Sequence, residues 1–174
     1  MENRSKKARR VALGGMLFAL ACLLSLLEGS ITPLLGLPPG VKPGLANIVV
    51  MYALFFLDGR RAAELVALKG LFAFLTRGAS AAALSLAGGF LSLAVMVVLR
   101  LVTKKRASLL ALSVAGAVSH NLGQLAMAAL WLSSAFSLAY APVLIVSGIV
   151  MGAVTSISLK VLLPALERLG LSAE

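Results

Sequence analysis

Apolar residues along this chain fall into six runs, separated by short segments rich in charged residues, glycine or proline. A helix needs about 20 mostly apolar residues to cross a bilayer. The pattern therefore predicts an all-α integral membrane protein, a six-transmembrane-helix bundle forming a single membrane domain over residues 1–174. The predicted helices cover residues 11–27, 43–57, 62–77, 79–100, 108–132 and 138–160. The second and third runs are short, so five spans with a re-entrant segment is an open alternative.

The first run has the arrangement of a signal peptide, with basic residues from Arg4 to Arg10 followed by an apolar stretch. No small-x-small cleavage site followed by a polar sequence comes after it, so we interpret residues 11–27 as a retained helix. The external loop predicted at residues 28–44 contains four prolines and is largely apolar. Proline fixes the backbone, so we expect this loop to be ordered and able to cover a site.

Composition supports a membrane protein, because 60% of residues are hydrophobic and only 13% are charged. All of the 16 lysines and arginines except Lys42, Lys69 and Arg77 fall in segments that are cytoplasmic if the N-terminus is inside. This bias follows the positive-inside rule and predicts that both termini are cytoplasmic. The net charge of +10 is thus a topology signal, and we expect no nucleic-acid partner.

The fifth run carries His120, Asn121 and Gln124 near its centre. His120 and Gln124 are four residues apart and share a helix face. Polar groups inside a bilayer must find partners, and asparagine commonly finds them on a neighbouring helix. We favour that interpretation for Asn121 taken alone. For the group as a whole, a ligand site is the better interpretation, because several such residues exceed what packing requires.

Lys69 lies within the third run, where a buried ammonium group must pair, reach water or lose its charge. It either pairs with a carbonyl on another helix or meets an anionic substrate group, with help from Lys42 or Arg77 on the external side. Asn47 near the outer end of the second run and Tyr140 at a pocket mouth complete the candidates. The predicted substrate-binding residues are His120, Asn121, Gln124, Lys69, Asn47, Lys42 and Tyr140.

Several kinds of chemistry are missing from the sequence. It has no nucleotide-binding P-loop motif, its single aspartate and five glutamates are scattered, and it has one histidine and one cysteine. Clustered carboxylates would be needed to hold Mg²⁺ against a diphosphate, and a zinc site needs several His or Cys ligands. We therefore expect a protein that is not an enzyme and has no cofactor or metal site.

Small residues mark places where helices can approach closely. Gly88 and Gly89 in the fourth run, and Gly148 and Gly152 in the sixth, are expected to pack inside the bundle. For Gly15 and Ala19 on the first helix two interpretations stay open, packing within the bundle and docking of another membrane subunit; the family resemblance described below favours docking.

Four segments together resemble one bacterial membrane family. They are Gly40–Val49, Leu84–Gly89, the His-Asn-Leu-Gly-Gln motif at 120–124, and the Tyr-x-Pro element at 140–142. The family is the Gx transporter family, also called heptaprenyl diphosphate synthase component I, and it is similar to the S components of energy-coupling-factor (ECF) transporters.

This resemblance implies a subunit of the bacterial cell membrane that captures a small molecule from outside. It would then join an ECF coupling subunit and two cytosolic ATPases. The second family name implies an alternative, a membrane accessory subunit of heptaprenyl diphosphate synthase in isoprenoid or quinone side-chain synthesis. In that case Lys42, Lys69 or Arg77 would face a diphosphate, and a soluble partner would supply the aspartates.

Overall fold

The computed structural model of the chain describes residues 2–36, 44–104, 106–132 and 139–168. All regular secondary structure in these residues is helical. The helices are α1 (Glu2–Ile31), the 3₁₀ helix η1 (Thr32–Leu35), α2 (Asn47–Phe56), α3 (Gly59–Arg77), α4 (Ala79–Val102), α5 (Leu109–Leu132) and α7 (Ala141–Arg168).

Local sequence sets the ends of several helices. The carboxylate of Asp58 accepts a hydrogen bond of 2.7 Å from the backbone N–H of Arg61 and so caps the start of α3. Gly78, with a φ of 87°, separates α3 from α4, a backbone conformation that favours glycine. α1 ends at Ile31, two residues before Pro33, which cannot continue a helix.

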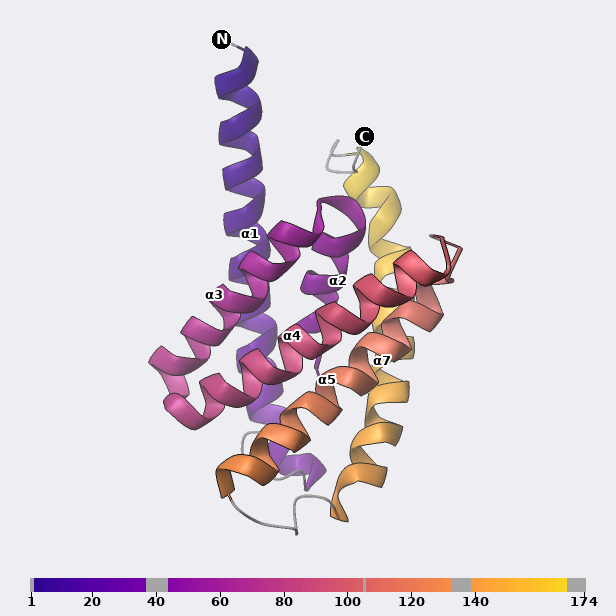
Figure 1. Cartoon of the computed structure of the whole chain (residues 1–174). Helices are drawn as coiled ribbons and strands as arrows, with labels where there is room; N and C mark the ends of the chain where they lie inside the picture. Colours follow the sequence, from indigo (N-terminus) through magenta and orange to yellow (C-terminus); the bar gives the residue numbers. More distant parts are fainter. Residues whose placement is uncertain (1, 37–43, 105, 133–138, 169–174) are drawn as a thin grey trace.

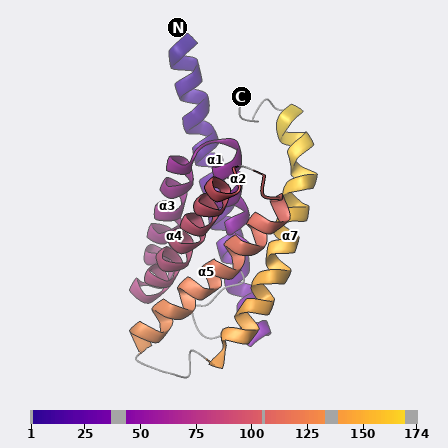
Figure 2. The ribbon, with the colours of Figure 1, turned by 45° about the vertical axis from the view of Figure 1, so that its right-hand side comes forward.

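Helices α3, α4, α5 and α7 lie side by side in chain order, with α1 and α2 against one face of this layer (Figures 1 and 2). The start of α1 and the end of α7 lie at the same end of the bundle (Figure 1). The junctions between α2 and α3 and between α4 and α5 lie at that end too. The predicted cytoplasmic segments therefore share one end, and their cytoplasmic location stays a prediction.

α2 is the central helix of the bundle. All its residues from Asn47 to Leu54 are buried except Ile48, and they form the main hydrophobic core with residues of α1, α3, α4, α5 and α7. Its ten residues extend only about 15 Å, half the thickness of a bilayer's hydrocarbon core. Its apolar sequence thus reflects burial in protein rather than contact with lipid.

Four of the described helices are long and apolar enough to cross a membrane, namely α1 from Val11, α4, α5 and α7 to Val161. They expose large apolar side chains, such as Leu130 at 77% and Val102 at 74%. Soluble proteins rarely expose apolar surface on this scale, so the fold is that of a multi-pass membrane protein. The count of six spans stays a prediction, because α2 is short and α3 carries several charges.

Several predicted boundaries were wrong. The loop expected at 28–44 begins later, because α1 continues through Ile31 and η1 follows, with residues 37–43 outside the described part. α1 also begins at Glu2 rather than at residue 11, and α7 continues to Arg168 rather than ending at residue 160. Hydropathy marks where an apolar stretch ends, whereas a helix can continue through the residues beyond it, as at the polar start of α1 and through Pro164 in α7.

Glycines let α5 and α7 pack with their backbones almost in contact. A Cβ atom added to Gly152 would lie 2.5 Å from the Cα of Val114, and one added to Gly148 would lie 2.9 Å from the Cα of Val118. The expected close approach at these two glycines is confirmed.

Gly152→Ala should therefore lower the free energy of unfolding by about 1–3 kcal/mol, since overpacking against a backbone forces the two helices apart. The measurement is unfolding of the purified protein in detergent by heat or by a denaturing detergent. Gly15→Ala is the matched control, because nothing lies within 4 Å of its added Cβ. Equal losses in the two variants would contradict the packing described here.

Candidate ligand-binding site

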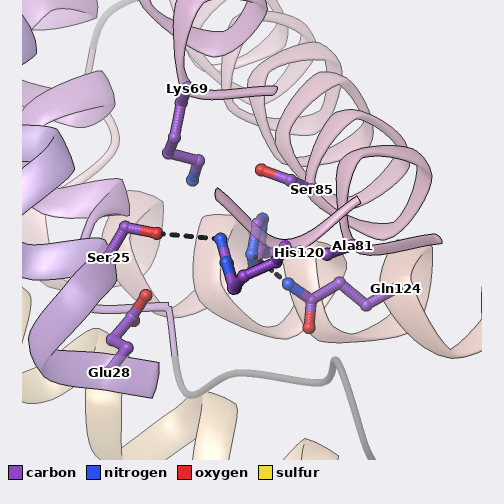
Figure 3. A pocket seen from close by; sticks show the side chains of 8 residues that line it. Ser25, Glu28, Lys69, Ala81, Ser85, His120 and Gln124 are labelled. Atoms are coloured by element: carbon purple, nitrogen blue, oxygen red, sulfur yellow. Dashed lines mark hydrogen bonds between the residues drawn. The ribbon is translucent and has the colours of Figure 1, made fainter. Parts of the chain in front are cut away.

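A cavity lies among α1, α3, α4 and α5, in the half of the bundle away from the chain ends (Figures 1 and 3). Each helix contributes two residues to its lining. They are Ser25 and Glu28, Lys69 and Arg77, Ala81 and Ser85, and His120 and Gln124. Glu28 is in the last turn of α1, Arg77 ends α3 and Ala81 lies in the first turn of α4, so the cavity adjoins that end of the bundle.

α1 brings its two polar residues to the cavity through a regular buried stripe. Leu17, Ala21, Ser25 and Glu28 are all buried, while the residues between them on the other faces are mostly exposed. Their spacing of four, four and three residues places them on one face of a helix. Ser25 and Glu28 therefore lie on the same face of α1 as Leu17 and Ala21, the face that packs against the bundle.

Three charged groups meet in the cavity. Lys69 is 4% exposed and Glu28 is 2% exposed, and the charges of Glu28 and Arg77 both act on the Lys69 ammonium group. Lys69 Nζ also donates a hydrogen bond of 3.1 Å to Oδ1 of Asn47 on α2. Arg77 Nη2 donates to Oγ of Ser25 at 3.3 Å. Buried charges require such partners, because removing them from water is costly.

His120 and Gln124 form the opposite side of the cavity (Figure 3). Nε2 of Gln124 lies 2.8 Å from Nε2 of His120. With the amide oriented in this way its nitrogen can only donate, so the neutral imidazole accepts at Nε2 and carries its proton on Nδ1. The backbone of Gly88 lies near the ring, but Nδ1 makes no hydrogen bond of good geometry.

The start of α2 closes the inner side of this site. Gly44, with a φ of 96°, sits beside both Asn47 and His120, and a Cβ there would lie 3.4 Å from Nδ2 of Asn47 and 3.5 Å from Cδ2 of His120. Nδ2 of Asn47 is buried without a hydrogen-bond partner among the described residues. Asn47 thus lies beside His120 and holds Lys69 through its Oδ1, although it is not itself part of the cavity lining.

The structure groups some of the predicted site residues and separates others. His120, Gln124 and Lys69 line the cavity, and Asn47 contacts Lys69. Asn121 instead points to α7, where its Nδ2 donates to the carbonyl of Leu144 at 2.8 Å. Tyr140 is 39% exposed next to the start of α7 and is not part of the lining, and Lys42 lies outside the described residues.

Sequence reasoning left Glu28, Ser25 and Ser85 out of the site, and it treated Arg77 only as an alternative. The loop predicted to begin at residue 28 removed Glu28 from the first helix. The signal that would have found it is the spacing of Leu17, Ala21, Ser25 and Glu28, which continues one helix face past the last leucines. Ser85 lies three residues before Gly88 and would have needed a view of the packing between α4 and α5.

The cavity is small in this conformation. Together with the open space at its edge, the cavity has a volume of about 270 Å³. Its interior has room for roughly one water molecule. The described residues contain no group of three or more His, Cys, Asp or Glu that could hold a metal ion. The lining is suited to a small polar molecule held by hydrogen bonds and charge.

The helical bundle and its enclosed polar cavity define a class, the multi-pass membrane proteins with a buried polar site. Within this class, a family model described as heptaprenyl diphosphate synthase component I matches residues 17–162. The chain belongs to this family, which confirms the resemblance seen in its sequence motifs. No curated protein and no solved structure gives a significant match.

Proposed function

We propose that this chain is the substrate-binding membrane subunit, or S component, of an ECF-type importer in the bacterial cell membrane. It is not an enzyme on this proposal. It captures a small molecule from the external side and delivers it with the help of an ECF coupling subunit and cytosolic ATPases.

One observation carries the proposal, the cluster of Glu28, Lys69, His120 and Gln124 around a cavity inside a membrane bundle. Ionisable residues within a bilayer are costly and most often mark a substrate or ion pathway. Four separate helices supply the lining, as expected of a site that must hold a ligand. The cavity lies in the half of the bundle away from the termini, which is the external half if the basic segments are cytoplasmic.

The first helix supports an assembly role. Gly15 and Ala19 are exposed on α1, and nothing lies within 4 Å of a Cβ added to Gly15. A face of small residues allows close contact with another membrane helix. We propose this face as the contact with the coupling subunit.

The experiment that tests the function has two parts. The first identifies, by mass spectrometry, the small molecule that co-purifies with the detergent-solubilised protein. The second asks whether a tagged chain isolates a membrane coupling subunit together with ATPases. An isolate that contains neither ATPases nor a coupling subunit would contradict the importer role.

Single variants then test the site. His120→Ala and Gln124→Ala should each weaken binding of the co-purified molecule by about tenfold or more, because a hydrogen-bonded pair in the lining is lost. Ser119→Ala on the same helix is the control, since its hydroxyl donates within α5 to the carbonyls of Ala115 and Gly116. Affinity equal to the wild type in both site variants would remove this pair from the site.

The alternative function is a membrane accessory subunit of heptaprenyl diphosphate synthase. It is favoured by the family description and by the two cations, Lys69 and Arg77, in the cavity lining. Co-purification of a soluble prenyl synthase, and loss of its activity when this chain is removed, would support this function and not the importer.

A further inference from the structure

The cavity lining contains more positive than negative charge. Lys69 and Arg77 contribute two cations and Glu28 one carboxylate, while the imidazole of His120 is neutral in the hydrogen-bonded form described above. Two of the other acids, Asp58 and Glu64, lie around the start of α3 at the opposite end of the bundle, with side chains more than half exposed. Glu2 begins α1 and Glu167 lies in the last turn of α7, also near that end. Among the described residues, Glu28 is therefore the only acid in this half of the molecule.

With Lys69 buried and Arg77 half-buried, the excess of one positive charge in the lining is unfavourable when the site is empty. The interior of a membrane bundle screens charge poorly, so an uncompensated cation is costly there. A ligand with one negative charge removes this cost. A cationic ligand would add to it, and a diphosphate would replace it with an excess of negative charge.

The positions of the groups also indicate where an anion would lie. Lys69 and Arg77 are eight residues apart on α3 and both line the same cavity as His120 and Gln124. Two cations in one lining match the two acceptor oxygens of a carboxylate, whose lone pairs accept several hydrogen bonds.

We infer that the site binds a small organic acid as its monoanion, with the carboxylate held by Lys69 and Arg77. This inference rests on the proposed function and names the chemical class of its substrate. Glu28 then sets the charge of the site, so that one negative charge and no more is accepted.

Acetate is the probe, because it is the smallest carboxylate with a methyl group and so requires the least widening of a space that now holds roughly one water molecule. The full chain, purified in detergent and freed of co-purified molecules, is titrated with sodium acetate while its melting temperature is followed. Acetamide, of the same shape but neutral, is titrated in parallel, and inorganic diphosphate is the third probe. We expect a saturable rise with acetate, none with acetamide and a smaller effect with diphosphate.

Charge variants locate the effect. Lys69→Gln and Arg77→Gln should each weaken acetate binding by about tenfold or more, because each removes a charge-assisted hydrogen bond. Arg77 is only half-buried at the end of α3, so its variant keeps the test valid if Lys69→Gln fails to fold. Lys160→Gln makes the same charge change on an exposed residue of α7 and should bind acetate as the wild type does.

Three results with acetate and acetamide would overturn the inference. They are the absence of a saturable acetate effect, an equal effect of acetamide, and unchanged acetate binding in Arg77→Gln. A larger saturable effect of diphosphate would also overturn it and would favour the synthase role instead. If the coupling subunit is isolated but acetate does not bind, the importer role is kept and the substrate class is rejected. If acetate binds but no coupling subunit or ATPase is isolated, the anion site is kept and the importer role is rejected.

Discussion

Glu28→Gln should lower the free energy of unfolding by about 3–5 kcal/mol, the range for removing one partner from a buried group of charges. Glu28 is 2% exposed, and its carboxylate acts on both Lys69 and Arg77. The glutamine keeps the shape but leaves two cations without their counter-charge. The measurement is unfolding of the purified variant in detergent, by heat or denaturing detergent.

Glu64→Gln is the matched control for this variant. Its side chain is 52% exposed and pairs with Arg60 at 3.2 Å on the surface of α3, a pair that contributes about 0.5 kcal/mol or less. The double variant Glu28→Gln with Lys69→Met should recover part of the loss, because the unpaired cation is removed with its partner. If Glu28→Gln and Glu64→Gln lose the same stability, Glu28 is not part of a buried charge group.

Gly88→Ala should damage both the packing of α4 on α5 and the binding of the ligand. The added Cβ would lie 2.7 Å from the carbonyl oxygen of His120, 2.8 Å from Cγ of Gln124 and 2.9 Å from Cε1 of His120. The backbone contact cannot be relieved by rotating a side chain. We expect a loss of stability of about 3 kcal/mol, at the upper end for overpacked cores, and a shift of the His120–Gln124 pair out of position.

A measurement of ligand binding distinguishes Gly88→Ala from a variant that only disturbs packing. The small molecule that co-purifies with the wild type should be retained by Gly152→Ala, which crowds α5 and α7, and lost from Gly88→Ala. Gly14→Ala is the control for the glycine replacement itself, because its nearest contact, Nη1 of Arg61 at 3.7 Å, is an ordinary one. Retention of the molecule by Gly88→Ala would show that the histidine–glutamine pair does not bind it.

Much of the bundle followed from the pattern of apolar residues. The predicted ends of α4 and α5 agree with the structure to within two residues, because both helices are bounded by glycine, charged residues or serine. The environment of α2 could not be predicted, because an apolar run of this length is typical both of a short membrane span and of a helix buried in protein. The packing of the other helices around Val49, Val50 and Met51 shows that α2 is a helix buried in protein.

The site was predictable where one helix carried the information. His120 and Gln124 share a face because they are four residues apart, and the same rule could have joined Ser25 to Glu28. The contact between Lys69 and Asn47 spans 22 residues and depends on how α2 enters the bundle, which no local pattern encodes. Asn121 shows the converse, because its neighbours in sequence line the cavity while its own amide bonds to α7.

The buried stripe of α1 also bears on how the protein is made. α1 is synthesised first, and Glu28 must enter or approach the membrane before Lys69 and Arg77 exist to neutralise it. Its position in the last turn of α1 lets the carboxylate stay near the water interface during that interval, as polar side chains at helix ends commonly do. Helices α3, α4, α5 and α7, by contrast, each pack on the next helix made, an order of assembly that needs no distant partner. The carboxylate of Glu28 therefore gains its counter-charges only when α3 has been made and has packed against α1.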